Sequence, residues 1–373
     1  MTPAHPPLLR PTYAEINLSA LGRNLKKARA LAAAKCKLNP KIMLLVKAEA
    51  YGHGALAVAM YAQKNKLAQA LGAASVEEGI YLRQNGVKLP ILILGSVYPF
   101  EGFEYALKNN LSVTIASARA AKYVAALAAK LKIKAKAHVK QETGLNRIGS
   151  RKPAALEILK ILNAAPYVKV EGVYSHIAAA DNKASVKKQL EYFKDFLSQA
   201  AALNLKTGMA HIAASPSFLK YGGICFDMLR LGHLAYGLDK GFEPALALKS
   251  KVVFIKDVRA GVGVSYGGVF KTKKPSKIAT IPIGYGDGYH RLLSGKANVL
   301  IKGKKCPVVG NITMDMLTAD ITKLGDIPVG SEAVLIGRQG KAQITAAEVA
   351  AQAQTIDYEV VTAISARVPR VIK

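Results

Sequence analysis

Lys47 stands where an amine can act as a nucleophile. It directly follows residues 42–46, an uninterrupted apolar run that predicts a buried strand, and Gly52 and Gly54 mark the turn that comes next. An amine at the end of such a strand is partly desolvated, which favours its neutral form and allows it to attack a carbonyl and form a Schiff base. The alternative is a lysine whose apolar stem covers the strand end while its ammonium group stays in water.

Strand-like and helix-like segments alternate between residues 41 and 237, and this alternation must position Lys47. The strand-like segments are residues 42–46, 70–74, 91–94, 112–116, 134–139, 170–175, 209–213 and 228–235. Amphipathic stretches lie between them, and Ser75 and Ser117 are expected helix N-caps. Eight strand–helix units predict an α/β fold with a (β/α)8 TIM-like barrel, because a doubly wound sheet more often has about five to seven strands.

A mostly β C-terminal domain is predicted after residues 241–244. From there the sequence changes to short apolar segments separated by Gly, Pro and Lys, with few helix-like stretches before residues 345–354. We therefore expect a barrel domain over residues 1–242 and a mostly β domain over residues 243–373. Residues 12–18, ahead of the first long helix, are a candidate extra strand of the second domain.

The composition predicts a soluble cytoplasmic protein. Although 51% of the residues are hydrophobic, no run of about 18 apolar residues appears, and residues 1–7 lack the layout of a signal peptide. Cys36, Cys225 and Cys306 are scattered and odd in number, so the sequence supports neither a disulfide framework nor a metal site. We expect these cysteines to be small buried hydrophobic residues.

The formal net charge of +29 requires an explanation. A basic face can recruit nucleic acid through its phosphates. The lysines are dispersed along the chain, however, and no arginine-rich tail or aromatic-interleaved basic motif is present. This pattern favours a solvated positive surface, and a nucleic-acid partner or the steering of anionic substrates is the alternative.

Polar residues follow several of the predicted barrel strands. In a barrel of this type the residues just after the strands meet at one face, where active sites are built. They are here Lys47, Tyr51, residues 140–147, His176, Ser215, Arg230 and Gly232. Phosphate groups bind near the last two strands of such barrels, which selects Ser215, Gly232 and His233. A reactive lysine beside a phosphate site indicates pyridoxal phosphate as the cofactor.

The sequence resembles the alanine racemases over nearly its whole length. The matching segments are residues 10–16, 46–54, 143–149, 176–181, 226–230, 264–267, 281–288, 314–315 and 367–370. One such segment would be a weak signal, but this many in the family's order make a specific one. The resemblance implies a pyridoxal-phosphate enzyme that interconverts L-alanine and D-alanine and supplies D-alanine for peptidoglycan.

The resemblance also implies a two-base mechanism, because racemisation takes the α-proton from one face of the substrate and returns it to the other. Lys47 matches the lysine that holds the cofactor, and Tyr266 matches the tyrosine of the opposite face. Arg230 matches the residue that donates a hydrogen bond to the pyridine nitrogen. The implied cofactor ligands are Lys47, Tyr51, His176 behind Arg230, Ser215, Gly232, the backbone amide of His233, and Tyr358.

For the substrate, the resemblance implies that Arg147 and the backbone of Met314 hold the carboxylate. Lys140 matches a lysine that is carbamylated in the family, and a plain lysine paired with a carboxylate is the alternative. The substrate path is implied to be lined by Asp181, Tyr285 and Arg291. Tyr266, Tyr285 and Met314 are implied to reach into the neighbouring subunit of a homodimer.

Several residues depart from the family's pattern, and they leave the substrate range open. These are Ala214, Leu231 and His233 near the phosphate, and Thr313 beside the substrate methyl group. A racemase of broader or shifted specificity, for serine or lysine, is therefore one alternative. A non-catalytic carrier of pyridoxal phosphate is the alternative of another class, and Tyr266 and Met314 argue against it.

Overall fold

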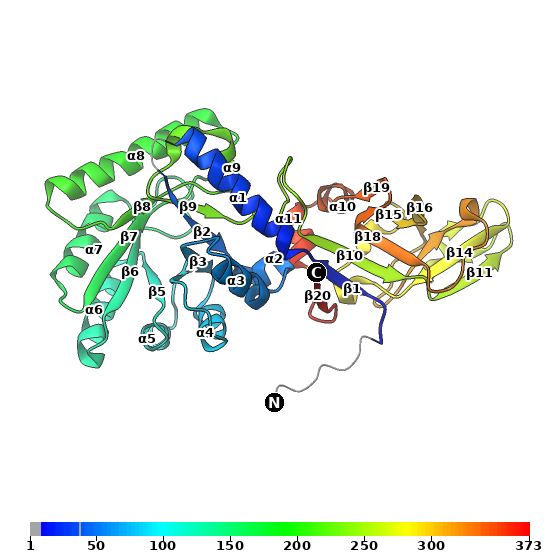
Figure 1. Ribbon diagram of the computed structural model, residues 1–373, viewed down its shortest axis with the longest axis horizontal. Coiled ribbons are helices and arrows are strands. Elements are labelled where there is room, and N and C mark those ends of the chain that lie inside the picture. The colour runs from blue at the N-terminus through cyan, green and yellow to red at the C-terminus, as the bar shows by residue number, and fades with distance from the viewer. Residues whose placement is uncertain (1–8, 37–38) are drawn as a thin grey trace. The chain divides into compact units, whose positions relative to one another are not determined.

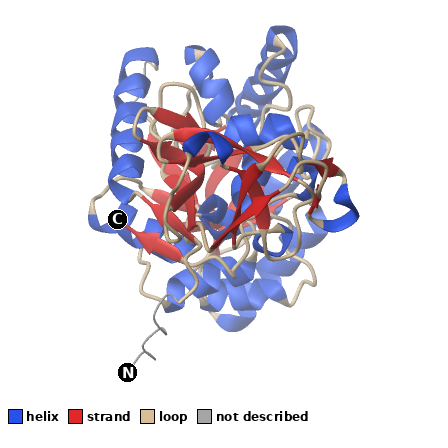
Figure 2. Cartoon of the chain, turned by 90° about the vertical axis from the view of Figure 1, so that its right-hand side faces the viewer, coloured by secondary structure: helices blue, strands red, loops and turns tan. Residues whose placement is uncertain are grey.

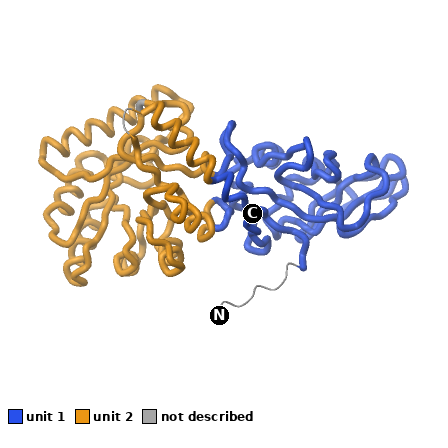
Figure 3. The backbone as a smooth tube through the Cα atoms, viewed as in Figure 1, with its two compact units in different colours: residues 1–21, 51–54, 236–373 blue, residues 22–50, 55–235 orange. Residues whose placement is uncertain are grey.

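The structure is a computed structural model, and it describes residues 9–36 and 39–373. The chain divides into two compact units (Figure 3). The barrel unit comprises residues 22–50 and 55–235, and the second unit comprises the chain before residue 22 together with residues 51–54 and 236–373. Each unit is described below by itself.

The barrel unit is built on parallel strands flanked by helices (Figure 1). In the described residues its strands are β2 (Lys41–Leu45), β3 (Ala70–Ala73), β4 (Ile91–Ile93), β5 (Ser112–Ile115), β6 (Ala135–Lys140), β7 (Val168–Tyr174), β8 (Met209–His211) and β9 (Met228–Leu231). Each predicted strand-like segment thus overlaps a strand, with ends that differ by a few residues. The sheet order is β8-β7-β6-β5-β4-β3-β2-β9, with every pair parallel. The TIM-like barrel is therefore confirmed.

The barrel nearly closes between β8 and β9. The backbone N–H of Asp227 donates to Ala210 O, and the Asp227 carboxylate accepts a hydrogen bond of 2.7 Å from Ala210 N. Further along, Ala214 forms an isolated parallel bridge with Arg230. One carboxylate thus completes the ring at the point where the two terminal strands lack a regular ladder.

The core of the barrel follows from the apolar strands. Ile42, Met43 and Leu44 in β2 are all buried, so both faces of this strand are covered, as expected in a parallel sheet. Met43 packs with Ala70, Leu92 and Met228 in one cluster. Burial on both faces explains why these strands read as continuous apolar runs rather than as alternating patterns.

Helices follow most of the strands. They are α1 (Leu18–Lys35), α2 (Lys47–Gly52), α3 (Ala55–Lys64), α4 (Val76–Gln84), α5 (Gly102–Lys108), α6 (Ala118–Leu131), α7 (Lys152–Ala164), α8 (Lys183–Ala202) and α9 (Ser215–Lys220). The Ser75 side chain accepts from Glu78 N at the start of α4, and the Ser117 side chain accepts from Ala120 N at the start of α6. Both predicted N-caps are thus confirmed.

The second unit consists mainly of strands, drawn in red in Figure 2. They are β1 (Tyr13–Ile16), β10 (Leu246–Lys251), β11 (Phe254–Val258), β12 (Gly263–Val264), β13 (Phe270–Lys271), β14 (Ser276–Ile281), β15 (Asn298–Ile301), β16 (Lys304–Val309), β17 (Leu317–Asp320), β18 (Glu332–Gln339), β19 (Ala342–Ile344) and β20 (Arg370–Ile372). Two helices, α10 (Ala346–Ala353) and α11 (Asp357–Thr362), follow β19. The mostly β character predicted for this part of the chain is confirmed.

Segments that are far apart in sequence meet in this sheet. In the described residues the strand order is β11-β14-β17-β16-β15-β18-β10-β1-β20, with β19 paired to β18. β1 pairs antiparallel with β10, placing Tyr13 opposite Lys249, and parallel with β20, placing Ala14 opposite Arg370. The separate hairpin β12–β13 places Gly263 opposite Lys271.

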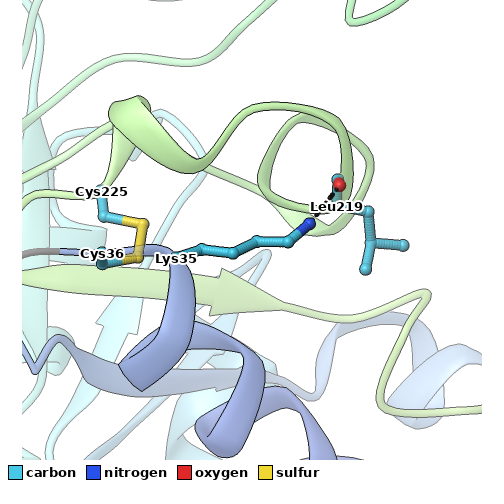
Figure 4. The surroundings of a disulfide bond; sticks show 4 residues. All are labelled: Lys35, Cys36, Leu219 and Cys225. Atoms are coloured by element: carbon cyan, nitrogen blue, oxygen red, sulfur yellow. Dashed lines mark hydrogen bonds between the residues drawn. A yellow bond between two sulfur atoms is a disulfide. The ribbon is translucent and has the colours of Figure 1, made fainter.

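The cysteine prediction is partly wrong. Cys36 and Cys225 form a disulfide bond, with 5.8 Å between their Cα atoms, although 189 residues separate them in sequence (Figure 4). The spacing of the cysteines in sequence could not indicate this bond. The bond forms because the end of α1 packs against the segment between α9 and β9. Lys35 strengthens the same junction by donating a hydrogen bond of 2.7 Å to Leu219 O.

Cys306 matches the expectation for a small buried residue, because it is free and buried. Burial raises the pKa of its thiol to about 11. Over the ranges that the structure describes, no helix is both long and apolar enough to cross a membrane. The same ranges contain no group of three His, Cys, Asp or Glu side chains placed to hold a metal ion.

Candidate active site

The backbone that follows Lys47 is left-handed. Positive φ values between 50° and 56° occur at four successive residues, Ala48, Glu49, Ala50 and Tyr51. The short helix α2 therefore has the opposite hand to an ordinary α-helix, at a cost of about 1–2 kcal/mol per residue. Strained backbone of this kind persists only where surrounding contacts hold it, and it gathers at functional sites.

Lys47 is half-buried at the carboxyl end of β2. The pKa of its amine is lowered, first because burial disfavours the charged form and second because Arg147 is near. Glu78 acts in the opposite direction. The amine is therefore closer to its neutral, nucleophilic form than an exposed lysine would be.

Lys140 and Arg147 belong to the same cationic cluster. Lys140 ends β6 and is only 4% exposed. Burial, followed by the charges of Arg147 and Arg230, lowers the pKa of the Lys140 amine to about 8. Several cations with few carboxylates beside them form a site that favours anions.

The loop that carries Arg147 is closed at its base. Ser150 N donates to Lys140 O at 3.0 Å, and Glu142 N donates to Ser150 O at 2.9 Å. Gln141 and Ser150 form an isolated parallel bridge between these two bonds. The backbone thus returns to the end of β6, which limits the positions that the Arg147 side chain can reach.

Arg230 lies in β9 and is 2% exposed. Its NH1 group contacts His211 Nδ1 at 2.9 Å and donates to His211 O, and its NH2 group contacts His176 Nδ1 at 3.1 Å. NH2 also donates to Ser175 O and Ile212 O. In the part of the chain that the structure describes, Arg230 Nε makes no hydrogen bond, so one N–H remains to be donated.

The two histidines that contact Arg230 remain neutral at ordinary pH. Burial and the neighbouring Arg230 lower the pKa of His176 to about 3, and the same causes lower the pKa of His211 well below its usual value. A neutral imidazole can accept a hydrogen bond from a guanidinium at one nitrogen. The two rings therefore fix the orientation of Arg230 without adding charge.

Residues that the sequence analysis missed extend this network. His211 Nε2 lies 3.1 Å from His138 Nδ1, and the Tyr174 ring stacks on His211 with 4.9 Å between centroids. The Tyr174 hydroxyl is 2.8 Å from Thr114 Oγ1. All of these residues lie within predicted strands, and only a polar residue at an inward-facing position of an apolar strand could have indicated them.

Ser215, Gly232 and His233 are brought together at the ends of β8 and β9. Gly232 N and Leu234 N both donate to Ser215 Oγ at 3.3 Å. β9 was predicted to continue to residue 235 but ends at Leu231, because the chain turns there to direct these amides toward Ser215. The hydroxyl proton of Ser215 is left available to an anion.

Tyr51 and Tyr358 lie together in the second unit. Their ring centroids are 5.7 Å apart, and the Tyr51 ring also contacts Tyr236 at 5.0 Å. Burial raises the pKa of the Tyr51 phenol to about 12, and burial and Tyr51 raise the pKa of Tyr358 further. Both phenols therefore keep their protons and can act as hydrogen-bond donors.

Tyr266 and Met314 are exposed on the second unit. Tyr266 follows β12 and is 75% exposed, whereas Met314 is 53% exposed. The backbone around Tyr266 is fixed, because Asn311 Nδ2 donates to Tyr266 O at 2.8 Å and Ser265 Oγ donates to Asn311 O at 2.6 Å. The backbone that carries Tyr266 is thus fixed, while its side chain remains uncovered.

Tyr285 is joined to the loop of Met314. Tyr285 N donates to Thr313 O at 3.1 Å, and Gly286 N donates to Met314 O at 2.9 Å. Asp287, a buried residue just beyond them, accepts two hydrogen bonds of 2.5 Å from the Arg10 guanidinium. This ion pair fixes the turn that presents Tyr285.

The residues implied to line the substrate path lie in different units. Asp181 is in the barrel unit, where it forms an ion pair with Lys220. Tyr285 and Arg291 are exposed residues of the second unit. Within the single chain, neither unit contains all three.

The residues of the barrel unit fit pyridoxal phosphate. Lys47 supplies an amine of lowered pKa for the aldehyde, and Arg230 has an unused Nε–H that can serve a ring nitrogen. The Ser215 hydroxyl accepts from the two amides directed toward it, so its proton is available as a donor to a phosphate. A nucleophile, a donor to a ring nitrogen and an anion site are the three groups that this cofactor requires.

Comparison with known proteins gives the same family for the whole chain. The family model "Alanine racemase, N-terminal domain" matches residues 16–240, and "Alanine racemase, C-terminal domain" matches residues 245–372. An alanine racemase from Halothermothrix orenii is 38% identical, with 98% of each chain covered. One from Clostridium novyi is 39% identical, with 97% of this chain and 95% of the relative covered.

Solved structures agree. The crystal structure of alanine racemase from Bacillus anthracis with bound L-Ala-P has a TM-score of 0.91 and 34% identity, and covers 99% of this chain and 96% of that one. Alanine racemase from Clostridium difficile 630 has a TM-score of 0.90 and 38% identity, covering 97% and 96%. The chain therefore belongs to the alanine racemase family: it is a pyridoxal-phosphate-dependent isomerase that interconverts L-alanine and D-alanine.

Proposed function

We propose that racemisation in this protein uses Lys47 as the base on one face of the substrate and Tyr266 of a neighbouring subunit as the base on the other. The observation that carries this proposal is the uncovered Tyr266 phenol, which is 75% exposed on a backbone fixed by Asn311. Bound pyridoxal phosphate supplies an electron sink that acidifies the α-hydrogen of the amino acid. The protein must then place one proton acceptor and one proton donor on opposite faces.

Lys47 is suited to both binding and proton transfer. Its lowered pKa favours the neutral amine, which is the form that attacks an aldehyde and the form that accepts a proton. Lys47 would hold the cofactor through this amine, and when the amine is free its Nζ would take a proton from one face of the substrate Cα or return one. The left-handed turn that starts at Ala48 fixes the direction in which Lys47 leaves β2.

Tyr266 requires a cationic environment, because a free phenol is a poor base at neutral pH. Arg147, which lies near Lys47 and Lys140 at the strand ends of the barrel unit, provides a cation for such an environment. We infer that two chains pair head to tail, so that the second domain of each, residues 243–373, brings Tyr266, Tyr285 and Met314 to the partner's barrel. The exposed apolar side chains of this unit are consistent with a surface that another chain covers.

Arg230 would donate its Nε–H to the pyridine nitrogen of the cofactor, while His176 and His211 hold its other two nitrogens. Because a guanidinium does not give up its proton at neutral pH, that nitrogen would stay unprotonated. This limits the electron withdrawal available to the substrate. The protein thereby favours proton transfer over reactions that need a stronger sink.

Anionic groups are assigned to two sites. Arg147 binds the substrate carboxylate, with the backbone of the partner chain's Met314 residue completing the site. Ser215, Gly232 and the backbone amide of His233 bind the phosphate, and the protonated phenols of Tyr51 and Tyr358 donate to it. Asp181, Tyr285 and Arg291 line the substrate path at the subunit boundary.

Lys140 is suited to carbamylation. With a pKa of about 8, its amine is partly neutral near physiological pH and can add carbon dioxide, releasing one proton and forming an N–C bond. The product replaces a cation beside Arg147 with an anion that can accept its hydrogen bonds. The carbamate then orients Arg147 toward the substrate.

Alanine is favoured over serine as the substrate. Thr313, the residue expected beside the substrate methyl group, uses its hydroxyl twice within its own turn: it donates to Met316 O at 2.9 Å and accepts from Met316 N at 3.1 Å. The proton of that hydroxyl is therefore already used within the turn, so Thr313 cannot donate a hydrogen bond to a serine side chain. The D-alanine produced is the form consumed in peptidoglycan synthesis.

The test is to incubate the protein with L-alanine in deuterium oxide while following optical rotation and deuterium at the α-carbon. We expect rotation to fall as deuterium enters, and Tyr266→Phe to slow both by about 10²–10⁴-fold while still binding the cofactor. Tyr105→Phe, at an exposed tyrosine of α5, is the matched control. Full activity of Tyr266→Phe, or cofactor found by borohydride reduction and peptide mapping at a lysine other than Lys47, would overturn the assignment.

A further inference from the structure

The left-handed turn after Lys47 needs contacts to hold it, and Glu78 supplies them. Glu78 lies in the first turn of α4, the helix that follows the neighbouring strand β3. Its Oε1 accepts a hydrogen bond of 2.7 Å from Ala48 N, the first amide of the left-handed turn. Its Oε2 accepts one of 2.6 Å from Ala74 N, just beyond β3. One carboxylate thus joins the ends of two adjacent strands.

The local sequence would direct this carboxylate elsewhere. Ser75 and Glu78 have the spacing of a capping box, and the Ser75 side chain does accept from Glu78 N at 3.3 Å. In that motif the glutamate returns to the backbone N–H of the N-cap residue itself. Here both oxygens bond other amides, including that of Ala48 across the sheet. The side chain is therefore used between strands, and only the serine acts as an ordinary cap.

We infer that Glu78 is a positioning residue for the racemase reaction: by binding Ala48 N and Ala74 N with one carboxylate, it fixes the direction in which Lys47 leaves β2. This inference rests on the proposed role of Lys47. Ala48 directly follows Lys47, so any rotation of this amide turns the backbone from which the Lys47 side chain projects. Both bonds have a charged acceptor, which makes them stronger than bonds between neutral groups.

The charge of Glu78 also acts on Lys47, so the test must separate charge from position. Glu78 is the carboxylate that raises the pKa of Lys47, against the lowering by burial and Arg147. Glu77 is next to it in sequence but is exposed, and it makes no hydrogen bond to Ala48 or Ala74 in the described residues. Glu77→Gln therefore removes the same charge from the same helix turn without breaking the link between the strands.

The experiment compares Glu78→Gln with Glu77→Gln in the enzyme with cofactor bound. An amide has one oxygen, so Glu78→Gln can keep only one of the two bonds and presents an NH2 group to the other N–H. We expect amide hydrogen exchange at Ala48 or Ala74 to rise more than about tenfold, and kcat to fall about 10- to 100-fold with less change in KM. Visible circular dichroism of the bound cofactor should change as well. Glu77→Gln should match the parent in all four measurements.

A second variant tests the inference if Glu78→Gln does not fold. Glu78→Asp keeps the charge but withdraws both oxygens by one methylene, so the amide hydrogen exchange of Ala48 should rise in this variant as well. Parent-like exchange and kcat in a folded Glu78 variant would overturn the inference. If instead the parent protein carries its cofactor on another lysine, the proposed role of Lys47 fails first, so the two failures are distinguishable.

Discussion

The barrel unit and the second unit prepare their candidate catalytic groups in opposite ways. Arg230 is 2% exposed and makes five contacts through its two terminal nitrogens, whereas Tyr266 is 75% exposed and its phenol makes no hydrogen bond in the described residues. Within the barrel unit, burial and neighbouring cations lower the pKa values of Lys47 and Lys140. Under the proposed mechanism, the barrel site is largely built by one chain, while Tyr266 becomes a base only against the surface of another chain.

The largest expected effect tests whether the two kinds of group come from different chains. Lys47→Ala and Tyr266→Phe should each reduce racemisation by about 10²–10⁴-fold when purified alone. If sites are shared between subunits, unfolding and refolding the two variants together should restore about a quarter of the parent activity, because half of the dimers are mixed and each mixed dimer holds one intact site. Racemisation assays on the refolded mixture measure this.

Refolding each variant alone is the control, and it should restore nothing. A mixture that stays inactive although mixed dimers form would contradict shared sites. Sedimentation at the assay concentration checks that the active species is the dimer.

Several features of the barrel unit could be predicted from the sequence. The apolar runs around residues 42–46 and 112–116 predicted barrel strands, because burial on both faces leaves a continuous signal. Lys47 was found for the same reason, as a charge at the end of such a run. The serines at positions 75 and 117 predicted helix starts because capping is a local interaction.

Contacts between distant segments could not be predicted in this way. The Cys36–Cys225 disulfide, the His211–His138 contact and the bonds from Glu78 to Ala48 each join residues that no periodicity relates. The left-handed turn at Ala48 was also unexpected, because alanine and glutamate favour the right-handed helix. Such features are set by tertiary packing, which overrides local preference.

The next largest expected effect is a loss of unfolding free energy in the barrel unit, with the candidate catalytic groups left in place. Cys36→Ser removes the disulfide that closes a loop of 189 residues, and the chain-entropy estimate for such a loop is a loss of up to about 5 kcal/mol of unfolding free energy. Denaturant unfolding measures this loss. Because neither cysteine is among the residues assigned to the site, kcat measured well below the melting temperature should stay within about twofold of the parent.

Cys306→Ser is the matched control, since Cys306 is free and buried in the second unit. It should change the stability less than Cys36→Ser does. Equal stability of the parent protein in oxidising and reducing buffers would show that the disulfide contributes nothing in solution.

A smaller effect tests how the second unit fixes its exposed groups. Asp287→Asn breaks the ion pair with Arg10 and should cost about 2–3 kcal/mol, because the Arg10 guanidinium loses its buried, charged acceptor. The pKa of Asp287 is lowered: burial raises it, but Arg10 and the Gly284 amide outweigh that effect. A carboxyl of lowered pKa stabilises the fold above its unfolded pKa of about 3.9 and loses this contribution as pH falls toward the folded value.

Acid unfolding followed at several pH values checks this prediction. Asp287→Asn should flatten the loss of stability below about pH 4, and it should raise KM for alanine because the turn carrying Tyr285 loosens. Asp315→Asn, at an exposed partner of Arg367, is the control and should have a smaller effect on both.

The smallest expected effect concerns Lys140 in the barrel unit. It tests whether the protonation state of the Lys140 amine is set by groups of its own chain. Its folded pKa of about 8 lies below the unfolded value of about 10.4, so the unfolded chain binds more protons between these values and stability rises with pH across that range. Without carbon dioxide we expect the unfolding free energy to rise by about 1 kcal/mol between pH 8 and 9, and Lys140→Met to remove that rise. Adding carbon-13 bicarbonate should produce a carbamate signal in the NMR spectrum of the parent but not of Lys140→Met, and should flatten the pH dependence because the neutral amine has been consumed. A rise that persists in Lys140→Met would place the titrating group elsewhere in the cationic cluster, and the barrel site would then depend less on Lys140 than its burial indicates.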